Sequence, residues 1–411
     1  YEDAVLVLKQ CTKKYPMLYY YAAYYEEKMG EDEAAKKSLE KAESCAFDYC
    51  FPNKLDDIAV LTFAIENGCK KKAPYYLGNL FYDKLQWKKS VELWEMSEKA
   101  DDTFSIVHRN LALAYYNKMG DSKAAKRELE KAFSLNRKDA RIFLELDQLY
   151  KKLGYSFKER LAKYDEDPSL AESRDDLYIE YITLMNMCGE YERAYRCIMG
   201  RRFHPWEGGE GKITTQYTIS LLEMAKQCLA SEKYEQAEKL LKKALVYPEN
   251  LGEGKLEGTK DNHLFYHLGL ALEAQGKNDE AKTCFETATI GTDEPAGAMY
   301  YNDQPADMIL YQGLAFEKLG KTREAKSRFY RLIDYGEQHL NDEGKIEYFA
   351  VSLPDFLIFD EDYTKKNRAH CCYLMALGNI GLQNREKAAE FLNEALEIEP
   401  SHMMATLYQK Q

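Results

Sequence analysis

The feature that most constrains how this chain folds is a repeated spacing of small and aromatic residues. In residues 262–295, Gly269 is followed by Gly276, Ala281 and Phe285, and residues 306–337 repeat the same offsets from Gly313. This spacing predicts two antiparallel helices. The first glycine lets the partner helix approach closely, and the second makes the turn because it can adopt positive φ. The alanine then lies where the helices cross, and the aromatic ring fills the gap beneath it.

Partial copies of the pattern occur along most of the chain. They are marked by Gly30 and Ala35, Gly78 and Trp94, Gly120 and Ala125, Gly189 and Ala194, Ala225 and Ala237, and Ala376 and Ala388. The pattern resembles the tetratricopeptide repeat (TPR), in which helix pairs stack and bury their faces on their neighbours. We therefore expect an all-α TPR superhelical solenoid. It should have about nine antiparallel helix pairs, an extra helix near residues 55–66 and long loops between repeats.

Composition narrows the classes of function. The formal net charge of −12 disfavours nucleic-acid binding, so no nucleic-acid partner is expected. No apolar run reaches the roughly 18 residues of a membrane span, and the ten cysteines contain no CxxC motif. We therefore expect reduced thiols, a cytoplasmic protein and no membrane partner. The chain begins at Tyr1, directly in helical pattern, so we interpret it as part of a longer protein.

The expected domain organisation is one continuous TPR solenoid over residues 1–411. Residues 1–200 hold the N-terminal repeats, 201–335 the repeats with decorated loops, and 336–411 an inserted helix and the C-terminal repeat. Long segments at 200–212, 247–260 and 291–305 each follow a second helix and precede the next first helix. Such connections leave a stack of helix pairs at the same end, so we expect the three loops to converge into one polar patch.

The interruptions carry a second resemblance. The segments DYCFPNKLDDIAVL, FHPWEGGEGK, YPENLGEGKL, EPAGAMYYNDQPADM and YFAVSLPDFLIFD are similar to those of large bacterial proteins in which a β-rich domain precedes a TPR region. Genes for such proteins often lie beside carbohydrate-utilisation genes. The resemblance implies a carbohydrate-associated bacterial protein, and it implies no particular reaction.

Two of the loops share the tetrapeptide GEGK, at residues 209–212 and 252–255. Neither matches a phosphate-binding P-loop, because a Ser or Thr does not follow the lysine. One interpretation is structural, with Lys and Glu pinning tight turns. The other is that adjacent loops hold a polar ligand. The ligand-binding candidates are His204, Trp206, Glu207, Glu210, Lys212, Glu253, Lys255, Tyr301 and Asp303.

The first helices of the pairs carry a second candidate surface. The chain has 33 tyrosines, and the repeat register places several on the face that lines the concave groove of a TPR array. Packing in the core is an equally good interpretation of these tyrosines. The groove candidates are Tyr20, Tyr24, Tyr75, Asn79, Tyr82, Arg109, Tyr116 and Asn117.

No catalytic residues, metal ligands or cofactors are expected. His263 and His267 are four residues apart but lack the glutamate and third ligand of a zinc site. We expect a non-enzymatic protein- or peptide-binding scaffold that docks another domain of its own parent protein. The alternative is an accessory part of a carbohydrate-active protein whose loops contribute to a saccharide site.

Overall fold

The computed structural model describes residues 1–204, 206, 208–297, 304–344 and 358–410. Within these residues it has 22 α-helices, two short helical turns and no strand, which confirms the all-α class. The chain divides into two compact units, Tyr1–Leu149 and Tyr150–Gln411. Helix α9 (Ala140–Lys152) spans this division, and each unit is described by itself. That all of residues 1–411 form one continuous solenoid stays a prediction.

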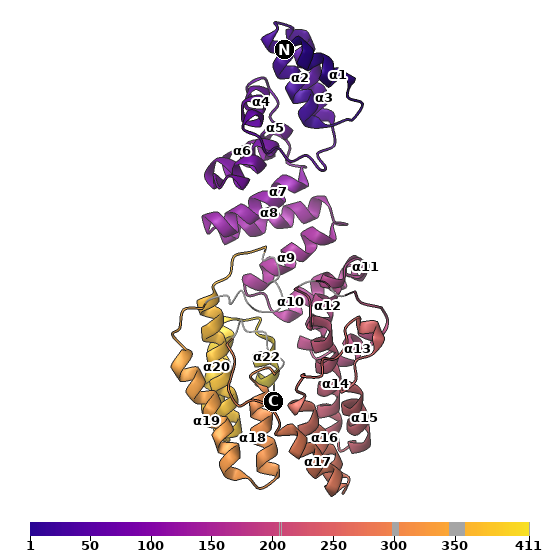
Figure 1. Ribbon diagram of the computed structural model, residues 1–411, viewed down its shortest axis with the longest axis vertical. Helices are drawn as coiled ribbons and strands as arrows, with labels where there is room; N and C mark the ends of the chain where they lie inside the picture. The colour runs from indigo at the N-terminus through magenta and orange to yellow at the C-terminus, as the bar shows by residue number, and fades with distance from the viewer. Residues whose placement is uncertain (205, 207, 298–303, 345–357, 411) are drawn as a thin grey trace. The chain divides into compact units, whose positions relative to one another are not determined.

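The first unit consists of helix pairs with one extra helix (Figure 1). The pairs are α2 with α3, α5 with α6, and α7 with α8. The expected extra helix is confirmed as α4, with the predicted bounds. The elements are α1 (Glu2–Gln10), α2 (Pro16–Lys28), α3 (Asp32–Ser44), α4 (Leu55–Glu66), α5 (Lys72–Asp83), α6 (Trp87–Ala100), α7 (Ser105–Ala114), a π-helical turn (Tyr115–Met119) and α8 (Ser122–Leu135).

The second unit continues the pairwise arrangement. Its pairs are α12 with α13, α14 with α15, α16 with α17, α18 with α19, and α20 with α21. The helices are α10 (Phe157–Asp165), α11 (Pro168–Glu172), α12 (Asp175–Met187), α13 (Tyr191–Met199), α14 (Lys212–Ala230), α15 (Tyr234–Ala244), α16 (Asn262–Ala274), α17 (Asn278–Ala288), α18 (Met308–Lys318), α19 (Thr322–His339), α20 (Tyr363–Gly381), α21 (Arg385–Ile398) and α22 (Met403–Gln409). The helix expected within 336–366 falls largely on residues 345–357, outside the described part of the chain.

The glycine of each first helix faces the aromatic ring of its second helix, as the spacing predicts. A Cβ added at Gly269 would lie 2.5 Å from Cε1 of Phe285, and one added at Gly78 would lie 2.5 Å from Nε1 of Trp94. The two crossing alanines are buried, with Ala281 2% and Ala325 0% exposed. The predicted repeat register is therefore confirmed in these pairs.

The turns within pairs use left-handed backbone whether or not glycine is present. Gly276 and Gly320 have φ of 77° and 72°. Leu85, Glu232 and Gln383 have φ near 60° at the corresponding turns of pairs that lack the glycine. An L-residue in this conformation costs roughly 1–2 kcal/mol. The turn geometry is thus imposed by the packing of the two helices, and it persists where the sequence pattern lapses.

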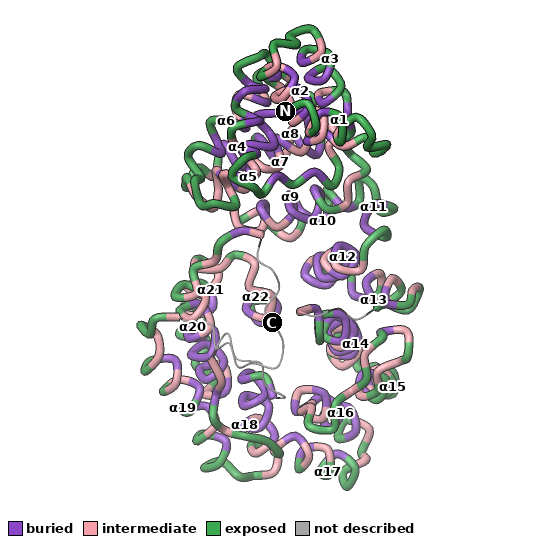
Figure 2. The backbone as a smooth tube through the Cα atoms, turned by 45° about the horizontal axis from the view of Figure 1, so that its top comes forward, coloured by how far each residue is buried: buried purple, intermediate pink, exposed green. Residues whose placement is uncertain are grey.

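Helix α22 closes the second unit upon itself. In Figure 2 helices α12 to α21 follow one another around this unit, and α22 lies inside them. Leu407 of α22 is 4% exposed and packs with Met187 of α12 and Ile219 of α14. On its other side, the Tyr408 hydroxyl donates to the Tyr311 hydroxyl of α18 over 2.7 Å. Helix α22 therefore packs against α12, α14 and α18 on the inner side of this unit.

Candidate functional site

The two GEGK loops of the second unit lie side by side. The backbone N–H of Gly211 donates to Oε2 of Glu253 over 2.8 Å, which joins the first loop to the second. Burial raises the pKa of Glu253; the Gly211 N–H opposes this rise, and the charge of Glu210 adds to it. The expected adjacency of these two loops is confirmed, and their role in ligand binding stays a prediction.

Further hydrogen bonds hold the two loop segments together. The Phe203 N–H donates to the Asn250 carbonyl over 2.8 Å. The Asn250 side chain donates in turn to the carbonyls of Ile198 (2.8 Å) and Arg201 (3.0 Å). The His204 N–H donates to Oδ2 of Asp175 over 2.9 Å, and its ring nitrogen Nδ1 lies 3.2 Å from the same oxygen. This edge of the unit is therefore a built, interlocked surface.

The two lysines of the GEGK loops have different surroundings. Lys255 pairs with Asp261 at 2.5 Å and donates to the Leu245 carbonyl, so this ammonium stabilises its own loop. Lys212 lies 5.8 Å from the centre of the Trp206 ring. That ring packs flat on Gly209, where an added Cβ would lie 2.5 Å from Cδ2 of Trp206. The half-buried Trp206 ring and Lys212 thus form the part of the patch best placed to meet a ligand.

The third loop makes its hydrogen bonds elsewhere in the unit. Gln304 and Gln312 both donate to the Thr292 carbonyl, over 2.6 and 3.0 Å. Arg328 of α19 pairs with Asp293 at 2.8 Å. The candidates Glu207, Tyr301 and Asp303 lie outside the described residues. The described part of 291–305 is thus anchored to α18 and α19, and its convergence with the GEGK loops stays a prediction.

Two of the predicted groove tyrosines are core residues, so their expected exposure on the groove is corrected. Tyr20 is 0% exposed, and its hydroxyl donates to Glu43. Tyr75 is 6% exposed and packs edge-on against Phe104. Both rings are covered because the neighbouring pair packs over the side of the first helix on which they lie. The core interpretation is correct for these two residues.

The other groove candidates are half-buried, and together with Asn110, which the sequence analysis did not single out, they form what we call the first-helix face. It consists of Tyr24, Asn79, Tyr82, Arg109, Asn110, Tyr116 and Asn117. The Asn110 amide donates to Oδ1 of Asn79 over 3.0 Å, linking α7 to α5. Arg109 donates two hydrogen bonds, of 2.7 and 2.5 Å, to the fully buried Glu145. Tyr116 and Asn117 lie on the π-helical turn, a feature often found at functional sites.

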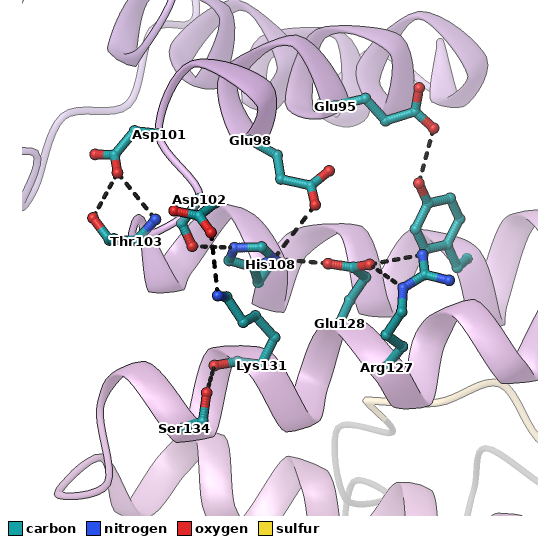
Figure 3. Close-up of polar contacts among 11 residues, drawn as sticks. Glu95, Glu98, Asp101, Asp102, Thr103, His108, Arg127, Glu128, Lys131 and Ser134 are labelled. Atoms are coloured by element: carbon teal, nitrogen blue, oxygen red, sulfur yellow. Dashed lines mark hydrogen bonds and ion pairs between the residues drawn. The ribbon is translucent and has the colours of Figure 1, made fainter.

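The first unit contains a cluster of titratable side chains that the spacing of residues in the sequence does not predict. Figure 3 shows Glu98 of α6, His108 of α7 and Glu128 of α8 pointing toward one another. Nδ1 of His108 lies 2.7 Å from Oε2 of Glu128 and 4.0 Å from Oε1 of Glu98. Its Nε2 lies 2.9 Å from the Asp102 carbonyl. The only signal in the sequence is that His108 stands between the core residues Val107 and Leu111.

The pKa values in this cluster are set by burial, by hydrogen bonds and by neighbouring charges. Burial disfavours charge on His108, but its hydrogen bonds to Glu128 and to the Asp102 carbonyl outweigh that effect and raise its pKa. Burial would likewise raise the pKa of Glu128, yet the hydrogen bonds from His108 and Arg127 lower it. Burial and the nearby charge of Glu128 raise the pKa of Glu98. The hydrogen bond between Nδ1 of His108 and Glu128 therefore contributes to the shifts of both groups.

Of the two histidines of α16, His267 is buried and His263 is half-buried. Nδ1 of His267 lies 2.7 Å from the His263 carbonyl, and the ring packs against Tyr311. Burial lowers the pKa of each histidine to about 3. A neutral imidazole packed among aromatic rings fits the structural interpretation of this pair.

The fold defines an α-solenoid of stacked helix pairs, a class whose members act as protein- and peptide-binding scaffolds and are typically non-catalytic. A tetratricopeptide repeat family model matches residues 110–139, 263–289 and 369–402, and a second tetratricopeptide repeat model matches 307–335. The chain therefore carries tetratricopeptide repeats in both units. In the described residues, no helix has the length and apolar character needed to cross a membrane.

Solved structures similar to this chain include three proteins of low identity. A tetratricopeptide repeat protein from Parabacteroides merdae is 14% identical, with 75% of this chain and 98% of that chain covered and a TM-score of 0.31. Naa15/Naa10 bound to HypK-THB is 12% identical, with 96% of this chain and 60% of that chain covered and a TM-score of 0.36. YrrB, described as a TPR protein with an unusual peptide-binding site, is 18% identical, with 63% of this chain and 100% of that chain covered and a TM-score of 0.22.

Proposed function

We propose that this chain is a non-enzymatic peptide-binding module that docks another domain of the polypeptide to which it belongs, through the first-helix face of its first unit. The observation that carries the proposal is the hydrogen bond between Asn79 and Asn110. It joins successive first helices into one half-buried strip of amides and aromatic rings. Such a strip suits an extended peptide segment.

The chemistry of the strip favours peptide over small-molecule binding. Tyrosine offers a large contact area and loses little conformational entropy when it is fixed. Asparagine presents both a donor and an acceptor, which matches the backbone of an extended segment. Tyr82 is held against Trp94, with ring centres 5.3 Å apart, so its position is set before a ligand arrives. Preorganised side chains of this kind reduce the entropic cost of binding.

The test is an array of overlapping peptides covering the whole polypeptide, probed with this chain and with two variants. Tyr82→Ala and Asn110→Ala should weaken binding to the captured peptides by roughly tenfold, the effect of about 1.4 kcal/mol. Tyr49→Ala is the matched control, because Tyr49 is 88% exposed in the same unit and lies outside the face. Melting temperatures establish that the variants are folded. Equal affinity of all three variants for every captured peptide contradicts the proposal.

The second candidate function is a saccharide site on the GEGK edge of the second unit. The half-buried Trp206 ring beside Lys212, flanked by Glu210 and Glu253, is the observation that favours it. Aromatic faces and charged side chains on a rigid surface can recognise sugar rings. Titration of oligosaccharides into the chain, followed by tryptophan fluorescence, tests this function. Trp206→Phe should abolish the response if Trp206 is the contact, and Trp87→Phe serves as the control.

A further inference from the structure

We propose that Glu98, His108 and Glu128 form a binding site for a divalent transition metal, with Zn²⁺ the ion that best fits the donor set. The site lies within the first unit, uses none of the residues of the first-helix face, and would clamp helices α6, α7 and α8 together. It is independent of the proposed peptide binding and concerns a different chemical class of ligand.

The geometry of the three donor atoms accommodates the ion. Nδ1 of His108 is 2.7 Å from the Glu128 oxygen and 4.0 Å from the Glu98 oxygen, and all three atoms lie within 4.8 Å of one another. A point no more than about 2.4 Å from every donor therefore exists, close to the roughly 2.0–2.2 Å of zinc–nitrogen and zinc–oxygen bonds. Tetrahedral bonds of this length would place the donors about 3.3–3.6 Å apart. Binding would therefore open the 2.7 Å contact between His108 and Glu128 as well as draw in the half-buried Glu98 side chain.

The hydrogen bond on the far side of the imidazole selects the ligand atom. A backbone carbonyl can only accept, so Nε2 of His108 carries the proton that it donates to Asp102 over 2.9 Å. Nδ1 then lies at hydrogen-bond distance, 2.7 Å, from Oε2 of Glu128. Two carboxylates face this nitrogen, so positive charge is favoured there, and a metal ion would bind by displacing the proton. A histidine that binds metal through one nitrogen commonly donates its other N–H to a carbonyl or carboxylate. The Asp102 carbonyl provides this support.

The donor set indicates which class of ion would bind, and the exposure of the side chains indicates how it would enter. A mixed set of one imidazole and two carboxylates favours zinc and its neighbours over Mg²⁺ or Ca²⁺, which prefer oxygen alone. Oε1 of Glu128 accepts from Arg127 at 2.8 Å, which leaves Oε2 facing the site. The Glu98 side chain is 30% exposed, whereas those of His108 and Glu128 are 2% and 4% exposed. An ion would therefore enter past Glu98.

The competing occupant of the site is a proton on Nδ1, which would make the cluster a buried imidazolium–carboxylate pair. The experiment that separates the two begins with the full chain freed of metal by a chelator. Zn²⁺ is titrated by calorimetry, and the melting temperature is followed with and without zinc. Co²⁺, used as a second probe, reports imidazole and carboxylate ligation through its visible absorption. Mg²⁺ is titrated in the same way, to test whether the site distinguishes a transition metal from a cation that prefers oxygen ligands.

Two matched glutamine variants make the test specific. Glu98→Gln removes the partly exposed ligand and is expected to fold, because it keeps the side-chain shape. Glu95→Gln is the control, since Glu95 lies on the same helix but accepts from the Tyr115 hydroxyl at 2.8 Å instead of facing the site. We expect Glu98→Gln to weaken zinc binding by roughly tenfold or more and to lose the zinc-dependent rise in melting temperature. Glu95→Gln should retain both.

Three results would overturn the proposal. The first is no zinc-dependent rise in the melting temperature of the unmodified chain. The second is an equal zinc response in Glu98→Gln and Glu95→Gln, which would place the metal on other side chains such as the cysteines. The third is an equal response to Mg²⁺, which would reject the assignment to a transition metal.

Discussion

Replacing Gly313 by alanine is the sharpest test of how the repeat pattern builds the second unit. A Cβ at this position would overlap Cε1 of Phe329 and lie 2.8 Å from Cδ1 and Cζ of the same ring. The ring is 0% exposed and also lies close to α20, because a Cβ at Gly381 would lie 2.5 Å from Cγ of Phe329. Phe329 is therefore clamped between glycines of α18 and α20, and any added methyl group must displace a helix.

The expected destabilisation follows from two opposing terms. Overpacking a filled core costs typically about 1–3 kcal/mol. Alanine recovers up to about 1 kcal/mol of helix propensity relative to glycine. We expect Gly313→Ala to lower the free energy of unfolding by about 1–2 kcal/mol. Gly269→Ala should cost less, because Phe285 is bordered by the flexible Lys318, whose Nζ lies 5.7 Å from the ring centre.

Urea unfolding followed by far-UV circular dichroism measures the effect, with Gly254→Ala as the control. An added Cβ at Gly254 meets nothing within 4 Å, so this loop variant should keep the unfolding midpoint. Phe329→Leu removes the clashing ring atoms, so Gly313→Ala should cost less in that background than alone. A Gly313→Ala variant as stable as the original chain, or identical costs in both backgrounds, would refute the clamp.

Three further predictions follow from the second unit. Leu407→Ala, which empties the contact of α22 with α12 and α14, should cost about 2–4 kcal/mol and lower the melting temperature. An unchanged melting temperature would show that α22 does not close this unit. Burial raises the pKa of Asp307 to about 6 from 3.8. The folded state therefore holds this proton more tightly, and the group's contribution to stability falls as pH rises from about 4 to about 6. Asp307→Asn should raise stability by about 1–3 kcal/mol at pH 7 and by little at pH 4, measured as urea midpoints. Equal shifts at both pH values would show that folding does not change the pKa of Asp307. Gln383→Gly should relieve the strain of the left-handed backbone at φ 61° and raise the free energy of unfolding by about 0.5–1 kcal/mol. Calorimetry that finds no rise in melting temperature would contradict this prediction.

The helix pairs could be predicted because their signal is local. Gly269, Ala281 and Phe285 meet across a single turn, so their sequence spacing determines their spatial contact. The same reasoning predicted the adjacency of the two GEGK loops, since consecutive pairs place their connections at the same end. It did not separate core tyrosines from groove tyrosines. Whether Tyr20 is covered depends on the next pair along the stack, which the repeat spacing does not specify.

Contacts between distant segments left no periodic signal. The Tyr408–Tyr311 hydrogen bond spans 97 residues, and the packing of Leu407 on Met187 spans more than twice that distance in sequence. The His108 cluster is similar in kind, because its three residues come from three helices and no motif spacing links them. A buried histidine is unremarkable by itself; its chemistry appears only when the carbonyl on one side and the carboxylates on the other are known.

The position of α22 limits where a ligand can bind in the second unit. In the second unit, Leu407 and Tyr408 of α22 cover parts of the inner sides of α12, α14 and α18. The edge held together by Gly211, Asn250 and Glu253 is a polar surface in the described part of this unit. In the described part of the first unit, the amide pair Asn79–Asn110 remains half-buried on the first-helix face. The peptide and saccharide proposals therefore concern separate surfaces, and variants of one should leave the other unaffected.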